Sequence, residues 1–131
     1  MSYIPKYILK RMFPPNCVKI VDNGVEIEMI NVISPLSIDD GVPESAENYL
    51  KVSVDDKELS AEQKKQIKFI VGDQTFLVTK AKEFEGVVIP VGGSVKVFLP
   101  VTGLKVGEEH EFEVIIQTNN PFQLKFSRPI S

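Results

Sequence analysis

The sequence contains no tryptophan, one cysteine and one histidine among its 131 residues. The single cysteine, Cys17, excludes an internal disulfide, and we interpret it as a small structural side chain, with a nucleophile or ligand as the alternative. The single histidine, His110, excludes a metal site built from several imidazoles. Without tryptophan, sugar binding by ring stacking would depend on Tyr3, Tyr7 or Tyr49.

The chain also lacks an excess of basic charge and any long apolar run. Its 15 lysines and arginines are outnumbered by 18 acidic residues, for a net charge of −3. Phosphate binding needs concentrated cations, so we expect no nucleic-acid partner. No stretch resembles a signal peptide or a membrane span, which predicts a cytoplasmic protein with no membrane partner. The small basic clusters are interpreted as solvated faces, namely Lys6, Lys10 and Arg11, and Lys64, Lys65 and Lys68.

Motifs of catalysis are missing as well. There is no G-x-S-x-G elbow, and Gly92-Gly93-Ser94 lacks the lysine and the helix of a phosphate loop, which favours a hairpin turn. His110 has the right chemistry for a general base, but glutamates surround it and no nucleophile lies at a motif-like spacing. We interpret it as a solvent-facing strand residue. No catalytic residue, cofactor or metal site is therefore predicted, which makes an enzyme less favoured without excluding one.

Acidic residues leave two alternatives open. The loop containing Asp39, Asp40 and Glu44 could offer oxygen ligands to Ca²⁺, although its spacing does not match the regular calcium-binding loop. A pair of carboxylates could also serve glycoside hydrolysis, since some of the 18 acidic residues must lie close together in any fold.

Period-two alternation of apolar and polar residues dominates the pattern, with turn residues every eight to twelve positions. It predicts one domain over residues 1–131 that is an all-β, antiparallel, two-sheet β-sandwich of the immunoglobulin-like kind. We expect eight or nine short strands and at most one short helix. The predicted strand segments are 18–20, 25–33, 50–54, 67–71, 75–79, 95–99, 111–118 and 122–126, and the second of them loses its alternation over residues 30–33. Residues 85–91 are a less certain edge strand, since Pro90 removes a backbone donor.

Two local motifs refine this expectation. Asp22-Asn23-Gly24 separates two alternating segments, and Asn-Gly is the strongest short hairpin signal because it accepts positive φ at both central positions. Ser60 and Gln63 have the spacing of a capping box, which predicts one or two helical turns over residues 61–66.

Residues 1–15 form an apolar arm before the first clear strand, and three prolines limit any helix there to a short one. The arm could supply an edge strand and a plug that closes one end of the sandwich. Alternatively it could be a docking surface for another chain, since interfaces favour aromatic residues, methionine and arginine. The predicted partner-binding residues are Tyr3, Tyr7, Met12, Phe13 and, from the carboxyl end, Phe122.

Four stretches, in order, resemble the small (beta) subunit family of C-glycoside deglycosidases. They are Lys6-Tyr7-Ile8-Leu9-Lys10, then residues 52–58 (VSVDDKE), 67–76 (IKFIVGDQTF) and 103–114 (GLKVGEEHEFEV). Together they span most of the chain. The sequence departs from the family pattern in an insertion over Ser34 to Asn48 and in a short turn after Phe76.

The resemblance implies a β-sandwich partner of a larger, barrel-type catalytic subunit that holds the divalent metal. The small subunit would stabilise and partly roof that active site, and no catalytic residue carries over to this chain. A non-catalytic accessory or assembly subunit is therefore the favoured hypothesis. The alternatives are a stand-alone carbohydrate-binding sandwich, a self-associating structural protein that forms a homo-oligomer, and a hydrolase with scattered carboxylates.

Overall fold

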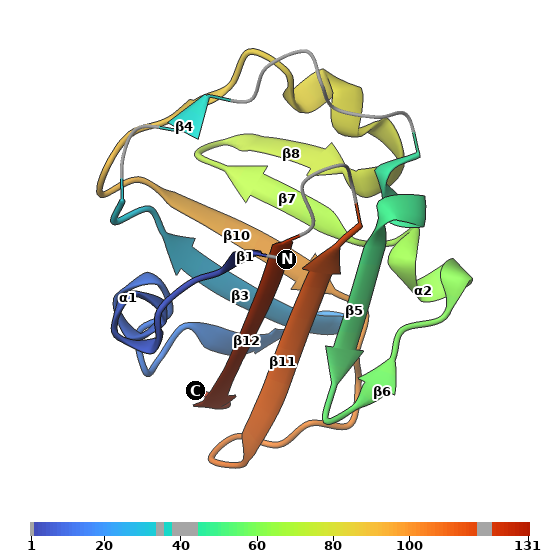
Figure 1. The fold of residues 1–131 in the computed structure, drawn as a ribbon. Helices are drawn as coiled ribbons and strands as arrows, with labels where there is room; N and C mark the ends of the chain where they lie inside the picture. Colours follow the sequence, from blue (N-terminus) through green and yellow to red (C-terminus); the bar gives the residue numbers. More distant parts are fainter. Residues whose placement is uncertain (1, 34–35, 38–44, 118–121) are drawn as a thin grey trace.

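The protein is a two-layer β-sandwich (Figure 1). The structure is a computed structural model that describes residues 2–33, 36–37, 45–117 and 122–131, and for residues 2–3, 36–37 and 122 it describes the backbone only. Two five-stranded sheets enclose a single core, and the fold prediction from the sequence is confirmed at this level. None of the helices within these ranges is long and apolar enough to cross a membrane.

The first sheet has the strand order β1-β12-β11-β5-β6. Its strands are β1 (Ser2–Tyr3), β12 (Phe122–Pro129), β11 (Glu109–Ile116), β5 (Leu50–Val54) and β6 (Lys57–Glu58). All neighbours are antiparallel except β1, which joins β12 in parallel, with Tyr3 opposite Gln123. The amino-terminal arm therefore does supply the edge strand that was expected of it.

The second sheet is antiparallel throughout, with the order β2-β3-β10-β7-β8. Its strands are β2 (Val18–Val21), β3 (Gly24–Ile30), β10 (Ser94–Leu99), β7 (Lys68–Val71) and β8 (Gln74–Leu77). A separate two-residue pair joins β4 (Leu36–Ser37) to β9 (Val88–Ile89), within the segment expected to be an edge strand. Eight of the strands have four or more residues, in line with the expected number, and the two-residue strands add to it.

Helical segments are more numerous than predicted. The structure has α1 (Lys6–Met12), α2 (Ala61–Lys64) and two 3₁₀ helices, η1 (Ala46–Tyr49) and η2 (Val78–Phe84). The predicted capping box is present at α2, where Ser60 Oγ accepts from the Gln63 amide and the Gln63 side chain accepts from the Ser60 amide. The expectation of at most one short helix is wrong because α1 forms between the prolines of the arm. Pro5 sits at its N-cap, where a missing N–H costs nothing.

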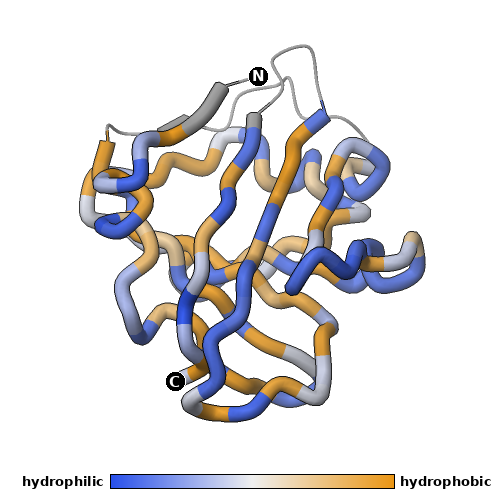
Figure 2. The backbone as a smooth tube through the Cα atoms, turned by 60° about the horizontal axis from the view of Figure 1, so that its bottom comes forward, coloured by the Kyte–Doolittle hydropathy of each residue, from blue (hydrophilic) through white to orange (hydrophobic). Residues whose placement is uncertain are grey.

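Alternation along the strands fills the space between the sheets. In Figure 2 apolar and polar segments alternate along the strands nearest the viewer. Three phenylalanines stack through the core beneath β12, with ring centroids 3.9 Å apart for Phe13 and Phe126 and 5.6 Å apart for Phe112 and Phe126. Burying such rings removes a large apolar area from water and adds a specific stacking geometry. The arm thus contributes Phe13 to the same stack as two central strands.

The β2–β3 hairpin forms where the sequence predicted it, but its turn lies one residue earlier. Val21 pairs with Gly24, so the two loop residues are Asp22 and Asn23, and Asn23 has φ of 69°. Asparagine tolerates this left-handed conformation better than most residues. Gly24 belongs to the strand, and a Cβ there would collide with the carbonyl oxygen of Leu99. Glycine is thus required by close packing against β10, and positive φ at Gly24 is not the reason.

Candidate functional site

A groove lies between α1 and the β12 edge of the first sheet. Its volume is about 500 Å³. We call it the α1–β12 groove, and it is lined by Ile4, Lys6, Leu9, Lys10, Glu111, Gln123, Lys125, Phe126, Ser127 and Arg128. One wall comes from the amino-terminal arm and the other from the last strand of the chain, so the site joins segments that are far apart in the sequence (Figure 1).

Helix α1 is held in place by its buried side and by its carboxyl end. Met12 is 6% exposed, and the partly buried side chains of Ile8 and Leu9 pack against the core. At the end of α1, the Phe13 amide donates to the Leu9 carbonyl and the Phe13 carbonyl accepts from Arg128 Nε at 2.6 Å. A charged donor makes this a strong hydrogen bond. It ties the helix to β12 and fixes the width of the groove.

The predicted partner-binding residues separate into three groups. Tyr7 is 70% exposed on the outer side of α1, as a contact residue should be. Met12 and Phe13 are 6% and 3% exposed, so the expectation that they belong to a docking surface is corrected: their own domain covers them. Tyr3 and Phe122 lie on the neighbouring strands β1 and β12, and their side chains fall outside the described part of the structure.

Positive charge concentrates in the groove although the whole chain is acidic. Lys6 and Lys10 lie one turn apart on α1, and Lys125 and Arg128 belong to β12. Lys125 is already engaged, at 3.5 Å from Glu111 and 4.0 Å from Glu113. The sequence alone predicts a solvated face for Lys6 and Lys10 and no role for Arg128. Nothing in local sequence could bring position 128 to position 13, because only the tertiary fold creates that contact.

The β12 edge inside the groove carries backbone groups that point away from the sheet. In β11, the Glu111 amide and carbonyl bond to Asp55 and the Gln117 amide to Tyr49, so odd-numbered residues there face β5. Even-numbered residues therefore pair with β12, where Phe126 lies opposite Phe112. By the same alternation, Lys125 and Ser127 direct their amides and carbonyls outward, toward α1.

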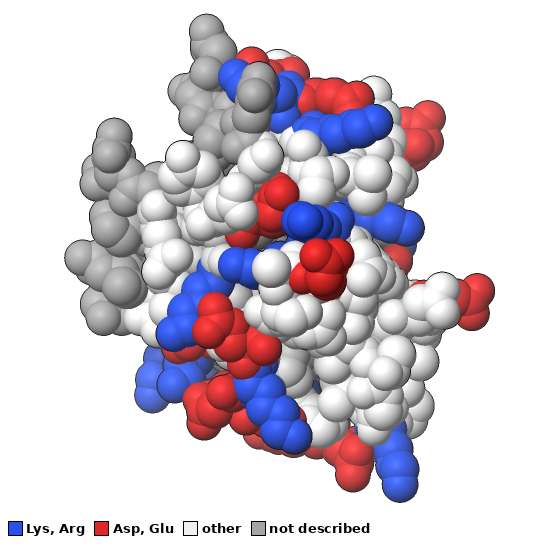
Figure 3. All heavy atoms as spheres, turned by 90° about the vertical axis from the view of Figure 1, so that its right-hand side faces the viewer, with Lys and Arg blue, Asp and Glu red and all other residues white. Residues whose placement is uncertain are grey.

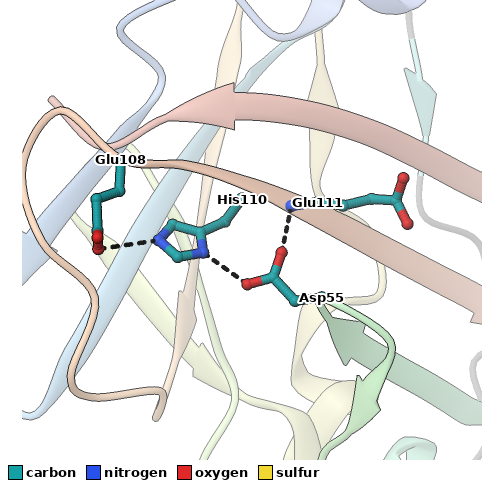
Figure 4. Close-up of polar contacts among 4 residues, drawn as sticks. All are labelled: Asp55, Glu108, His110 and Glu111. Atoms are coloured by element: carbon teal, nitrogen blue, oxygen red, sulfur yellow. Dashed lines mark hydrogen bonds and ion pairs between the residues drawn. The ribbon is translucent and has the colours of Figure 1, made fainter.

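His110 forms the other polar cluster, shown in Figure 4. Its Nδ1 lies 2.6 Å from Asp55 Oδ2, and its Nε2 lies 3.6 Å from Glu108 Oε1. The His110 side chain is 14% exposed, so the prediction of a solvent-facing residue is wrong. The cause is the β5–β6 turn, which brings Asp55 beside the start of β11, 55 positions away in the sequence.

Asp55 holds this cluster together. Its other oxygen, Oδ1, accepts from the Glu111 amide at 2.9 Å, and this bond, followed by that to His110, lowers the pKa of the Asp55 carboxyl below its ordinary value. The arrangement orients the imidazole as the acid does in a catalytic triad, but among the residues near it in the described structure no hydroxyl or thiol is placed against Nε2. The cluster clamps the β5–β6 turn to the start of β11, and within the described ranges it contains no nucleophile to activate.

Other candidate chemistry is not supported by geometry. Cys17 is buried, and burial raises the pKa of its thiol to about 11, so little thiolate forms at neutral pH. No group of three or more metal-ligating side chains occurs within the described ranges. The acidic loop with Asp39, Asp40 and Glu44 lies outside those ranges. Tyr7 belongs to α1 and is 70% exposed, Tyr49 lies directly before β5 and is 42% exposed, and α1 and β5 lie at opposite sides of the ribbon in Figure 1.

The lysines of the second basic cluster are occupied within the chain. Lys64 Nζ donates to the Leu50 carbonyl, Lys65 pairs with Glu62 at 3.6 Å, and the Lys68 ammonium lies 5.3 Å from the centre of the Phe98 ring. On the face shown in Figure 3, basic and acidic side chains are interspersed and no broad field of one sign appears.

No protein-family model and no curated protein matches the sequence of this chain.

Proposed function

We propose that this chain is a non-catalytic accessory subunit that docks on a larger catalytic subunit of a carbohydrate-active enzyme, of the C-glycoside deglycosidase type. The single observation that carries the proposal is the α1–β12 groove beside an exposed tyrosine. The groove is lined by both apolar and charged side chains, a mixture that protein interfaces use.

The resembling stretches give the second line of support. They lie in α1, in the β5–β6 hairpin, in the β7–β8 hairpin and in β11 with the loop before it, and so form parts of both sheets and one wall of the groove. The His110 cluster agrees with a subunit that relies on another chain for chemistry, because among the described residues its imidazole faces two carboxylates and no nucleophile.

The experiment is to purify the protein from its source without a tag on the arm, measure the native mass and assay glycoside cleavage. We expect a complex of fixed stoichiometry between this 14.7 kDa chain and one larger polypeptide, with the cleavage activity present only in the complex. Isolation as a monomer with no second polypeptide would contradict the proposal. A complex containing only copies of this chain would also contradict it and would favour a self-associating protein.

A further inference from the structure

The β12 edge stays open along the α1–β12 groove. Tyr3 of β1 covers the edge opposite Gln123, and Val18 bridges it again at Ile130. Between these two points the six residues from Leu124 to Pro129 have no neighbouring strand on that side among the described residues, a span of about 20 Å at the usual rise per residue.

The chain blocks part of this edge itself and leaves the rest available. Arg128 Nη1 donates to the Ser127 carbonyl at 2.7 Å, and Pro129 has no amide hydrogen. Two amides, of Lys125 and Ser127, and the Lys125 carbonyl still point outward within the described structure, and no hydrogen bond to them is formed there. An unpaired strand edge of this kind is a template for an added strand, and native proteins normally block it completely.

The side chains around the open groups favour one sign of charge. Lys6 and Lys10 are exposed on the facing helix. Arg128 donates from Nε and Nη1 to carbonyls of its own chain, so the Nη2 end of its planar guanidinium is left to contact a ligand. Glu111 is the only carboxylate that lines the groove within the described residues, and Lys125 neutralises it. Two amide donors, one carbonyl and a positive rim match an acidic segment in extended conformation.

We infer that the α1–β12 groove binds an extended, acidic peptide segment of the partner, which adds as a short strand to the β12 edge at Lys125–Ser127. The inference rests on the proposed function for the identity of the partner, and it adds how that partner is recognised. Backbone pairing at the edge supplies affinity, while Lys6, Lys10 and Arg128 select glutamate or aspartate side chains at alternate positions of the segment.

The test uses end-blocked hexapeptides and the isolated full chain. An alternating valine–glutamate peptide should bind saturably by calorimetry, with amide NMR shifts at residues 6–10 and 125–128. Matched valine–glutamine and valine–lysine peptides should bind at least about tenfold more weakly, since two or three charge contacts are lost or reversed. Octanoate, an anion with an apolar tail and no backbone, should also bind at least about tenfold more weakly. Equal binding by octanoate would overturn strand addition in favour of a small-anion site.

Two sets of variants test the lysine charges and the backbone pairing at the β12 edge separately. Lys6→Glu with Lys10→Glu should weaken the acidic peptide about tenfold, whereas Lys80→Glu with Lys105→Glu, an equal change of charge at exposed residues outside the groove, should have no such effect. Ser127→Pro, which removes an outward amide, should weaken binding about tenfold, whereas Ser127→Ala should not. If Ser127→Pro does not fold, an acidic peptide N-methylated at alternate positions tests the neighbouring edge bond, in which a peptide amide donates to the Lys125 carbonyl. If neither Ser127→Pro nor N-methylation of the peptide weakens binding, the inference is overturned.

The same variants distinguish this inference from the proposed function. A native complex that forms equally well with Lys6→Glu, Lys10→Glu and Ser127→Pro would leave the accessory role standing and would refute the groove as the recognition site. Tight binding of the acidic peptide by a chain that has no larger partner in its source would support the groove as a peptide site and would refute the accessory role.

Discussion

Asp55 lies in a two-residue turn between β5 and β6 and makes two contacts there that differ in kind. Asp55 and Asp56 have φ of 52° and 66°, as a hairpin turn with two left-handed residues requires, and aspartate accepts this conformation. Only Asp55 then directs its carboxylate to the Glu111 amide and the His110 ring. The two neighbouring aspartates therefore share a backbone role and differ in their side-chain partners.

Asp55→Asn should destabilise the fold by about 1 kcal/mol, because the amide forms weaker, uncharged hydrogen bonds at a side chain that is 46% exposed and screened by solvent. Asp56→Asn is the matched control and should change the free energy of unfolding by less than about 0.5 kcal/mol. Urea unfolding at neutral pH measures both. Equal effects of the two substitutions would show that the turn matters and the carboxylate contacts do not.

The Asp55 contacts also predict a pH dependence of stability. The folded protein holds the pKa of Asp55 below its ordinary value of 3.8, so the unfolded chain takes up the proton first as pH falls. The stabilisation is therefore present above the ordinary pKa and is lost as pH falls through the lower, folded-state pKa. The difference in unfolding free energy between wild type and Asp55→Asn should shrink below about pH 4. A difference that stays constant into strong acid would contradict this account.

At the scale of elements, α1 and Phe13 belong to the core as much as to the surface. Phe13→Ala should lower the free energy of unfolding by about 3–5 kcal/mol, since it opens a cavity beside Phe126. Tyr7→Ala, on the exposed side of the same helix, should change it by less than about 0.5 kcal/mol. Denaturant midpoints compare the two. A small effect of Phe13→Ala would mean that the arm is not docked in solution.

The β2–β3 hairpin gives a second element-scale prediction. Gly24→Ala should destabilise by about 1–3 kcal/mol, because the new methyl group meets the Leu99 carbonyl and the Phe98 ring across the sheet. Asn23→Gly, at the position that has positive φ, should cost about 0.5 kcal/mol or less. Thermal unfolding of both variants compares the effect of close packing at Gly24 with the effect of turn conformation at Asn23.

These elements show how far sequence reasoning reaches. Alternation identified the eight longer strands, and the Ser60 capping box identified α2, because both patterns depend on neighbours in the chain. The burial of Met12 and Phe13 agrees with the plug alternative for the arm and not with their prediction as docking residues, and the His110–Asp55 contact escaped prediction, since each depends on a partner brought close only by the fold. The register of the β2–β3 turn was missed because a close approach from β10 outweighed the local preference of Asn-Gly.

At the scale of the whole molecule, the α1–β12 groove joins the start of the chain to its end. A site built from residues 4–10 and 123–128 exists only when the sandwich is closed, so binding there should stabilise the folded state as a whole. The acidic peptide, at a concentration 100 times its dissociation constant, should add about 2.7 kcal/mol to the free energy of unfolding. Urea unfolding with and without peptide measures this gain, and an unchanged midpoint under those conditions would contradict a site specific to the folded chain.

Amide hydrogen exchange in the native complex tests the central claim most directly. In the free chain the Lys125 and Ser127 amides should exchange quickly, because they point outward from an open edge. In complex with the larger subunit both should slow by at least about tenfold, while the amides of β8, at the far edge of the second sheet, stay unchanged. Protection that appears elsewhere and leaves Lys125 and Ser127 as fast as in the free chain would contradict the account.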